Sequence, residues 1–232
     1  MTAGCVLAWM DVISTELDRS MAFYGQLFEW QTEHLRIDHG EAYHLVRSRG
    51  HIVSGAEAID PARNLEPVWT VMVECDDART FIDKAVAAGG KETFELSPML
   101  DLGSIAMVRD PWGATVGIWE PKGYRPSEVP LVPGRLVGAL LETPDAEASA
   151  RYYSSIFGWS RTSEPTALGA GLELPVVVDE RPGPSMWTPV LDGTGMDRQA
   201  LPAGRVLESG RKKVPGCEFL RDPMGAAFLV RT

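Results

Sequence analysis

The sequence predicts an α+β protein built from two tandem domains, because the same features occur twice along the chain. A turn of the form Arg-Asp-Pro-x-Gly-Ala lies at 109–114 and again at 221–226. An aromatic segment with matching positions lies at 23–30 and again at 152–159. A buried strand followed by a helix and short strands also begins each half. Two landmarks repeated in the same order indicate an internal duplication.

The repeated turn has the residue types that a tight connection between antiparallel strands needs. In the first copy, Asp110 can hydrogen-bond the backbone ahead of it, Pro111 presets φ, and Gly113 lets the chain leave the turn. Apolar runs flank both copies, so each turn is expected to join two strands near the end of its half.

The first half is predicted to follow the order strand, helix, strand, strand, strand, and then to repeat it. The expected first strand is 5–13, and the aromatic segment places a helix before Trp30. The further expected elements are strands at 31–37, 42–47, 51–58 and 68–75, a helix at 77–88, and strands at 91–96, 104–109 and 114–119.

The second half is expected to be a shortened copy. A strand at 135–142 and a helix at 145–157 begin it. The stretch 192–202 replaces the second helix of the first half and contains too much glycine for a long helix. Prolines throughout 121–134 indicate a linker. The predicted organisation is therefore a domain at 1–120, a Pro-rich linker at 121–134, and a shorter domain with a trimmed second module at 135–232.

Composition limits the classes of partner. The net charge of −10 and the scarcity of Lys/Arg clusters argue against nucleic acid or an anionic membrane as a partner. The chain begins without a charged-then-apolar leader and has no apolar run of 18 residues, so we expect a cytoplasmic protein. The expected assembly is a monomer or a homodimer that binds a small-molecule ligand. The three cysteines form no CxxC pair, and neither a disulfide framework nor a thiolate zinc site is expected.

The repeated landmarks resemble those of the vicinal oxygen chelate superfamily, which includes glyoxalases, bleomycin-resistance proteins and extradiol dioxygenases. The residues that carry the resemblance are the strand at 5–13, Ser20-x-x-Phe23-Tyr24, Leu27-Phe28-x-Trp30 and the turn at 109–114, with counterparts at 145–159 and 221–226. The chain looks like a tandem two-domain, glyoxalase-like protein. The resemblance implies that each domain pairs two βαβββ modules, whose curved mixed sheets enclose a cleft.

The resemblance also implies positions for metal ligands. Metal-using members hold a divalent ion with His, Gln or Glu side chains on the first, fourth, fifth and eighth strands. Counting from the landmarks places these positions at Trp9, between Ser54 and Glu57, at Val68 or Trp69, and at Gly117. The corresponding first and eighth positions of the second half are Gly138 and Leu229. Only Glu57 could bind a metal, so we expect no metal and no other cofactor.

All four histidines lie between 34 and 51. For a hairpin that turns at 38–41, strand alternation is expected to place His34 and His44 on opposite faces, with His39 in the turn and His51 on another strand. No convergence of ligands follows, and solvated histidines at the sheet edge are expected.

The cleft implied by the resemblance is expected to be aromatic. If Trp9 faces it, the period-two alternation of a strand brings Leu7 and Asp11 to the same side. The expected substrate-binding residues are Leu7, Trp9, Asp11, Val68, Trp69 and Gly117, and the expected catalytic residues are Asp11 and Glu57. Core packing of the two tryptophans and a structural hydrogen bond of Asp11 are the alternatives.

The predicted function is metal-independent binding of a small aromatic or apolar molecule in a Trp-lined cleft of the first domain. The alternative is a glyoxalase-like enzyme: a lyase, a dioxygenase, or a cofactor-free isomerase, cyclase or hydrolase that uses Asp11 or Glu57. A third alternative is an assembly partner whose clefts bind nothing. The second domain is expected to be a structural partner or a lid.

Overall fold

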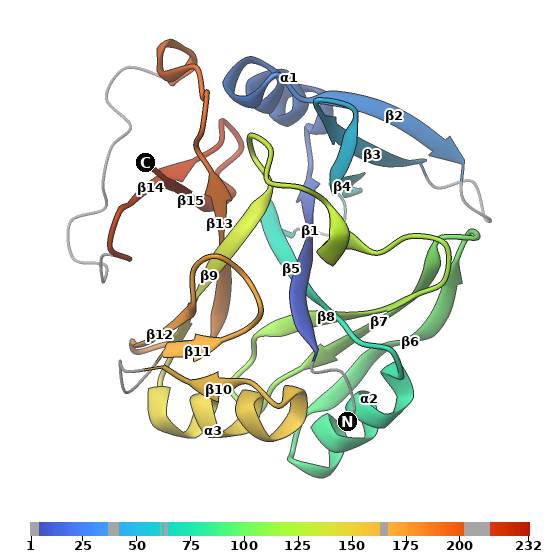
Figure 1. The fold of residues 1–232 in the computed structure, drawn as a ribbon, viewed down its shortest axis with the longest axis vertical. Coiled ribbons are helices and arrows are strands. Elements are labelled where there is room, and N and C mark those ends of the chain that lie inside the picture. Colours follow the sequence, from blue (N-terminus) through green and yellow to red (C-terminus); the bar gives the residue numbers. More distant parts are fainter. Residues whose placement is uncertain (1–4, 37–41, 61, 63–64, 163–166, 202–213) are drawn as a thin grey trace. The chain divides into compact units, whose positions relative to one another are not determined.

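A computed structural model describes residues 5–36, 42–60, 62, 65–162, 167–201 and 214–232 of the chain. Its elements follow the predicted order closely (Figure 1). The first half contains β1 (Val6–Ser14), α1 (Leu17–Phe28), β2 (Gln31–Arg36), β3 (Ala42–Ser48), β4 (His51–Ala58), β5 (Val68–Glu74), α2 (Ala78–Ala87), β6 (Lys91–Met99), β7 (Gly103–Arg109) and β8 (Thr115–Pro121).

The described part of the second half begins with the same order and then loses a helix. It contains β9 (Leu136–Thr143), α3 (Ala146–Phe157), β10 (Ser160–Arg161), β11 (Ala167–Gly169), β12 (Val176–Glu180), β13 (Met186–Asp192), β14 (Cys217–Arg221) and β15 (Ala227–Arg231). Short 3-10 helices lie at η2 (Pro126–Glu128) and η3 (Arg198–Ala200). The predicted absence of a long helix at 192–202 is confirmed, because only η3 forms there.

The strands form two mixed sheets, which confirms the predicted α+β class. The strand orders are β2-β3-β4-β1-β5-β8-β7-β6 and β10-β11-β12-β9-β13-β15-β14. The pairs β1–β4, β5–β8, β9–β12 and β13–β15 are parallel, and the hairpin neighbours are antiparallel. In each module, the first strand therefore pairs in parallel with the last strand, as a βαβββ arrangement requires.

The chain divides into two compact units, and each unit takes segments from both halves of the sequence. Unit 1 comprises Met1–Trp9, Val71–Glu128 and Gly138–Trp187. Unit 2 comprises Met10–Thr70, Val129–Val137 and Thr188–Thr232. The predicted domain boundaries at 120 and 135 stay a prediction.

In unit 1, the turn of the first half holds the helix of the second half. The Asp110 Oδ1 atom accepts hydrogen bonds from the backbone N–H groups of Trp112 and Ala114, at 2.9 and 2.8 Å. The Tyr153 hydroxyl on α3 donates to Asp110 Oδ2 at 2.9 Å, and Trp187 Nε1 donates to the Tyr153 oxygen at 3.3 Å. One buried carboxylate thus accepts hydrogen bonds from the backbone of its own turn and also anchors a helix.

Unit 2 repeats this arrangement with the halves exchanged. Asp222 Oδ1 accepts from two backbone N–H groups of its own turn, both at 2.9 Å. On α1, Ser20 Oγ donates to Asp222 Oδ2 at 3.0 Å. Trp69 Nε1 donates to the Tyr24 hydroxyl at 3.0 Å, and both side chains are buried. The aromatic side chains of the 23–30 segment, Phe23, Tyr24, Phe28 and Trp30, are all buried in the core.

The expectation of no disulfide was wrong. Cys5 and Cys75, both in unit 1, form a disulfide with their Cα atoms 4.7 Å apart. They are 70 residues apart in the sequence, but β1 and β5 are neighbours in the sheet order. Spacing in the sequence could not show this proximity, because it depends on strand order. Cys217 is a free thiol.

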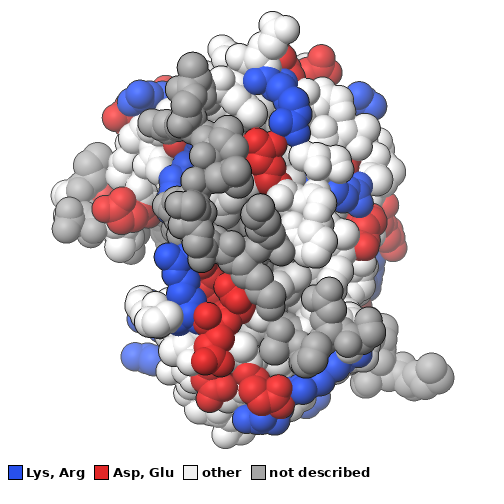
Figure 2. Space-filling model, turned by 90° about the vertical axis from the view of Figure 1, so that its left-hand side faces the viewer, with Lys and Arg blue, Asp and Glu red and all other residues white. Residues whose placement is uncertain are grey.

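None of the helices in the described ranges is long and apolar enough to cross a membrane. On the side shown in Figure 2, Lys and Arg side chains are interspersed with Asp and Glu, and a group of acidic side chains gathers in the lower part of the view. The expectation that nucleic acid is not a partner stays a prediction.

Candidate functional site

In unit 2, one face of the sheet points away from α1. Ser14 Oγ lies 2.9 Å from Ser20 Oγ of α1, so this side of β1 faces the helix. Alternation along the strand places Asp11 on the opposite side. The residues Asp11, Tyr43, Gly55 and Glu57 on this side are called the Asp11 face below.

The centre of the Asp11 face is a hydrogen-bonded pair of a carboxylate and a phenol. The Tyr43 hydroxyl donates to Asp11 Oδ1 at 2.8 Å, and both residues are buried. A Cβ atom at Gly55 would collide with the Tyr43 oxygen and with Asp11 Oδ1. The pair therefore lies directly over the Gly55 backbone, and this close approach requires glycine. Such a pair can accept, hold and return a proton.

Glu57 is the second predicted catalytic residue, and the structure places it on the same face. Register pairs Tyr43 with Glu57 across β3 and β4, and Asp11 with Gly55 across β1 and β4. Glu57 is half-buried. Tyr43 was missed from the sequence, although a glycine inside the strand 51–58 was a signal that another group approaches closely.

The predicted site residues on β5 fall on opposite faces. Trp69 is 2% exposed and donates its indole N–H to Tyr24 under α1. This fits the core-packing alternative for Trp69, and its place in the predicted binding set stays a prediction. Val68, one residue earlier, points the other way and is 36% exposed. Both residues stay in the predicted binding set, and Val68 is the more exposed of the two.

The other predicted binding residues, Leu7, Trp9 and Gly117, belong to unit 1. Leu7 is fully buried, and its N–H donates to the Ala170 carbonyl at 2.9 Å. Trp9 packs edge to face against Tyr124, with ring centroids 5.7 Å apart and planes inclined at 79°. Tyr124 is half-buried, so this aromatic pair reaches partly to the surface of its unit.

The eighth-strand position is filled by a neighbouring side chain. Gly117 pairs with Met72 across β8 and β5, and a Cβ atom on Gly117 would collide with Met72 Cγ. In the second half, a Cβ on Gly138 would lie 2.8 Å from Leu174 Cβ. Apolar atoms thus occupy the space that a ligating side chain would need at both positions.

The residues present do not fit the metal centre that the resemblance implies. Of the implied ligand positions in the first half, only Glu57 carries a donor of the right kind. Within the described ranges, no group of three or more His, Cys, Asp or Glu side chains lies in an arrangement that could hold an ion. No chemical step is therefore assigned to a metal at these positions.

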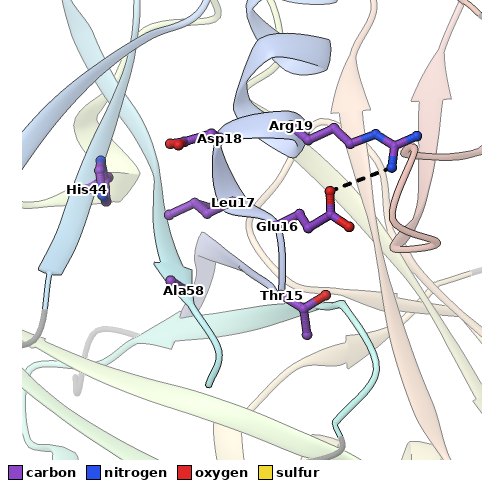
Figure 3. A pocket seen from close by; sticks show the side chains of 7 residues that line it. All are labelled: Thr15, Glu16, Leu17, Asp18, Arg19, His44 and Ala58. Carbon is purple, nitrogen blue, oxygen red and sulfur yellow. Dashed lines mark ion pairs between the residues drawn. The ribbon is translucent and has the colours of Figure 1, made fainter. Parts of the chain in front are cut away.

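The histidine prediction was wrong in one respect. His34 and His44 are directly paired in the antiparallel register of β2 and β3, so they share a face. Their ring centroids are 4.8 Å apart. His44 lines a pocket of about 440 Å³ beside the start of α1 (Figure 3). Burial, and then the neighbouring His34, lowers the pKa of His44, while Asp18 acts in the opposite direction.

Comparison with known proteins identifies the family of the fold. The model of the Glyoxalase/Bleomycin resistance protein/Dioxygenase superfamily matches residues 6–118, from the start of β1 into β8. Residues 6–118 belong to this superfamily. The resemblance inferred from the turn and the aromatic helix is confirmed, and the superfamily hosts unrelated activities on one fold.

Two curated relatives cover nearly the whole chain. A Mycobacterium tuberculosis protein named "Putative glyoxylase CFP32" is 24% identical over 96% of this chain and 92% of its own length. The Streptomyces peucetius anthracycline biosynthesis protein DnrV is 26% identical over 96% of this chain and 91% of its own length.

Solved structures share the fold of both halves. The 2,3-dioxygenase LapB from Pseudomonas sp. KL28 superposes with a TM-score of 0.64 at 14% identity, over 99% of this chain and 93% of that protein. The Mn(II)-bound glyoxalase from Novosphingobium aromaticivorans gives a TM-score of 0.64 at 14% identity, over 100% of this chain and 83% of that protein. At this identity the likeness describes the fold alone.

Proposed function

We propose that the protein binds a planar aromatic small molecule without a metal ion at the superfamily's ligand positions. The observation that carries this proposal is the packing of Met72 into the space beside Gly117. A carboxylate there would have to displace a fully buried side chain. At the eighth-strand position, apolar atoms of Met72 thus take the place of a ligating side chain.

The Trp9–Tyr124 pair supports an aromatic ligand. The pair reaches partly to the surface of its unit through Tyr124, and aromatic contacts with a fused-ring compound would add to the free energy of area burial. The relative named as an anthracycline biosynthesis protein supports the same ligand class, because anthracyclines contain fused aromatic rings.

A second candidate function is cofactor-free acid–base catalysis on the Asp11 face. The observation that favours it is the 2.8 Å hydrogen bond from the Tyr43 hydroxyl to Asp11 Oδ1. Asp11 would accept a proton from a carbon next to a carbonyl group and return it to another atom of the same molecule. Tyr43 would position the carboxylate and stabilise its charge.

Calorimetric titration with a hydroxyanthraquinone in buffer containing EDTA tests binding. Substituting Trp9→Leu or Tyr124→Leu should weaken binding by roughly 10-fold or more, as expected for losing a contact of about 1.5 kcal/mol. Trp112→Leu is the matched control, because Trp112 packs on Tyr152 elsewhere in unit 1. Binding that appears only when a divalent ion is restored would contradict the proposal, as would equal affinity of all three variants.

Solvent-deuterium exchange separates the two functions. If the Asp11 face is catalytic, the wild-type protein in D₂O should exchange the α-protons of an aromatic ketone, and Asp11→Asn should abolish the exchange. Tyr43→Phe should slow it without abolishing it. Tight binding with no exchange above the buffer rate would reject catalysis and leave the binding function.

A further inference from the structure

His34 and His44 form a cross-strand pair on the α1 side of the sheet. They face each other directly in the β2–β3 register, with centroids 4.8 Å apart and planes inclined at 81°. Two imidazoles that bind one ion through Zn–N bonds of about 2.0–2.1 Å have ring centroids roughly 4.5–5.5 Å apart. The pair therefore has the spacing that joint ligation of one ion needs.

We propose that His34 and His44 bind a divalent transition-metal ion, of the class of Zn²⁺, Ni²⁺ or Cu²⁺. Imidazole nitrogen is a preferred donor for these ions, whereas Mg²⁺ and Ca²⁺ prefer oxygen. No group of three or more candidate donors lies in ligand geometry in the described part of the chain. The protein thus supplies two ligands, and water completes the coordination.

Asp18 supports the ion from the other side of the pocket. Its side chain points towards His44, whereas Arg19 points away (Figure 3). The Arg19 guanidinium forms an ion pair with the Glu16 carboxylate at 3.6 Å, so this positive charge is already paired with a negative one. The Asp18 carboxylate can hydrogen-bond a metal-bound water or an imidazole N–H, as carboxylates commonly do beside His ligands.

The ion would connect the β2–β3 hairpin to the beginning of α1. This site lies on the opposite side of the sheet from Asp11, and it shares no residue with the Asp11 face or with the Trp9–Tyr124 pair. Ligand binding at those places and metal binding at the histidine pair can therefore be tested separately. An ion that binds only the folded state should also raise the unfolding temperature.

The test is titration of tag-free, chelator-treated full-length protein with Zn²⁺, followed by calorimetry. We expect one ion per chain, with affinity reduced at least 10-fold by either His34→Gln or His44→Gln. His51→Gln is the matched control, because His51 is exposed and lies outside the pair at the start of β4. Asp18→Asn should reduce the affinity by a smaller factor.

Electron paramagnetic resonance with one equivalent of Cu²⁺ counts the donors directly. The wild-type spectrum should show two coordinated nitrogens, and each single histidine variant should show one. The site is rejected if Zn²⁺ does not bind, if His51→Gln loses as much affinity as the other two variants, or if the Cu²⁺ spectrum of the wild type matches that of His34→Gln. His34 is exposed, so the His34→Gln variant should fold. If the His44→Gln variant does not fold, His34→Gln alone decides the outcome.

Discussion

Replacing Tyr153 by Phe removes one hydrogen bond from the contact that holds α3 to the turn of the first half. The lost bond is the 2.9 Å contact from the Tyr153 hydroxyl to Asp110 Oδ2. Hydrogen bonds to a charged group contribute about 1.5–3 kcal/mol. Trp187 Nε1 also loses its acceptor, so we expect a total loss of about 2–4 kcal/mol at pH 7. With an m-value of about 2–3 kcal/mol/M, the urea midpoint should fall by roughly 1 M.

The loss should depend on pH, because burial raises the pKa of Asp110 while the hydrogen bond from Tyr153 lowers it. A carboxyl whose pKa is raised by folding binds more protons in the native state than in the unfolded state. Its contribution to stability therefore falls as the pH rises from its unfolded-state pKa to its native-state pKa. Removing the hydroxyl raises the Asp110 pKa further. The penalty of Tyr153→Phe should therefore shrink towards about 1 kcal/mol at acidic pH, where a neutral carboxyl remains.

Tyr152→Phe is the control for this prediction. The Tyr152 hydroxyl donates to the uncharged carbonyl of Ala85 at 3.3 Å, so its loss should be about 0.5–1.5 kcal/mol at both pH values. Urea unfolding curves of the wild type and both variants at pH 7 and pH 4 provide the measurement. Equal losses of stability for Tyr153→Phe at the two pH values would falsify the claim that the Tyr153 hydroxyl donates to a charged Asp110.

Two further predictions concern packing and thiols. Gly117→Ala should destabilise the protein by about 1–3 kcal/mol in urea unfolding, because the added Cβ would collide with Met72. The control is Gly169→Ala, whose added Cβ has its nearest contact at 3.4 Å and which should change stability by less than about 0.5 kcal/mol. Similar values for both variants would show that Met72 does not fill the eighth-strand position. Thiol titration in denaturant should find one free thiol before reduction and three after it, and a count of three before reduction would contradict the disulfide. In the native state, burial raises the pKa of Cys217 to about 11, so its alkylation at pH 8 should be roughly 100-fold slower than that of an exposed cysteine.

Strand alternation gave part of the geometry around the candidate site. Period two groups Asp11 with Leu7 and Trp9 on one side of the first strand. In the structure, Asp11 lies on the side of β1 that points away from α1, with Glu57 on the same face, and their roles as site residues stay predictions. The partner of Asp11 could not be predicted, because Tyr43 reaches it across β4 and over Gly55. That contact depends on a hairpin register, and a one-residue change of register exchanges the two faces of a strand. The same dependence explains the wrong faces assigned to His34 and His44.

The sequence by itself determined the duplication, the order of helices and strands, and the replacement of metal-ligating residues at the superfamily's positions. These features depend on turn chemistry, periodicity and residue type, all of which can be recognised within short stretches of sequence. Only the tertiary structure decided which helix each turn holds: Asp110 binds Tyr153 and Asp222 binds Ser20, so each turn serves a helix of the other half. It also decided the Cys5–Cys75 disulfide. Contacts between segments this far apart arise from strand order and packing, and they leave no periodic pattern in the sequence.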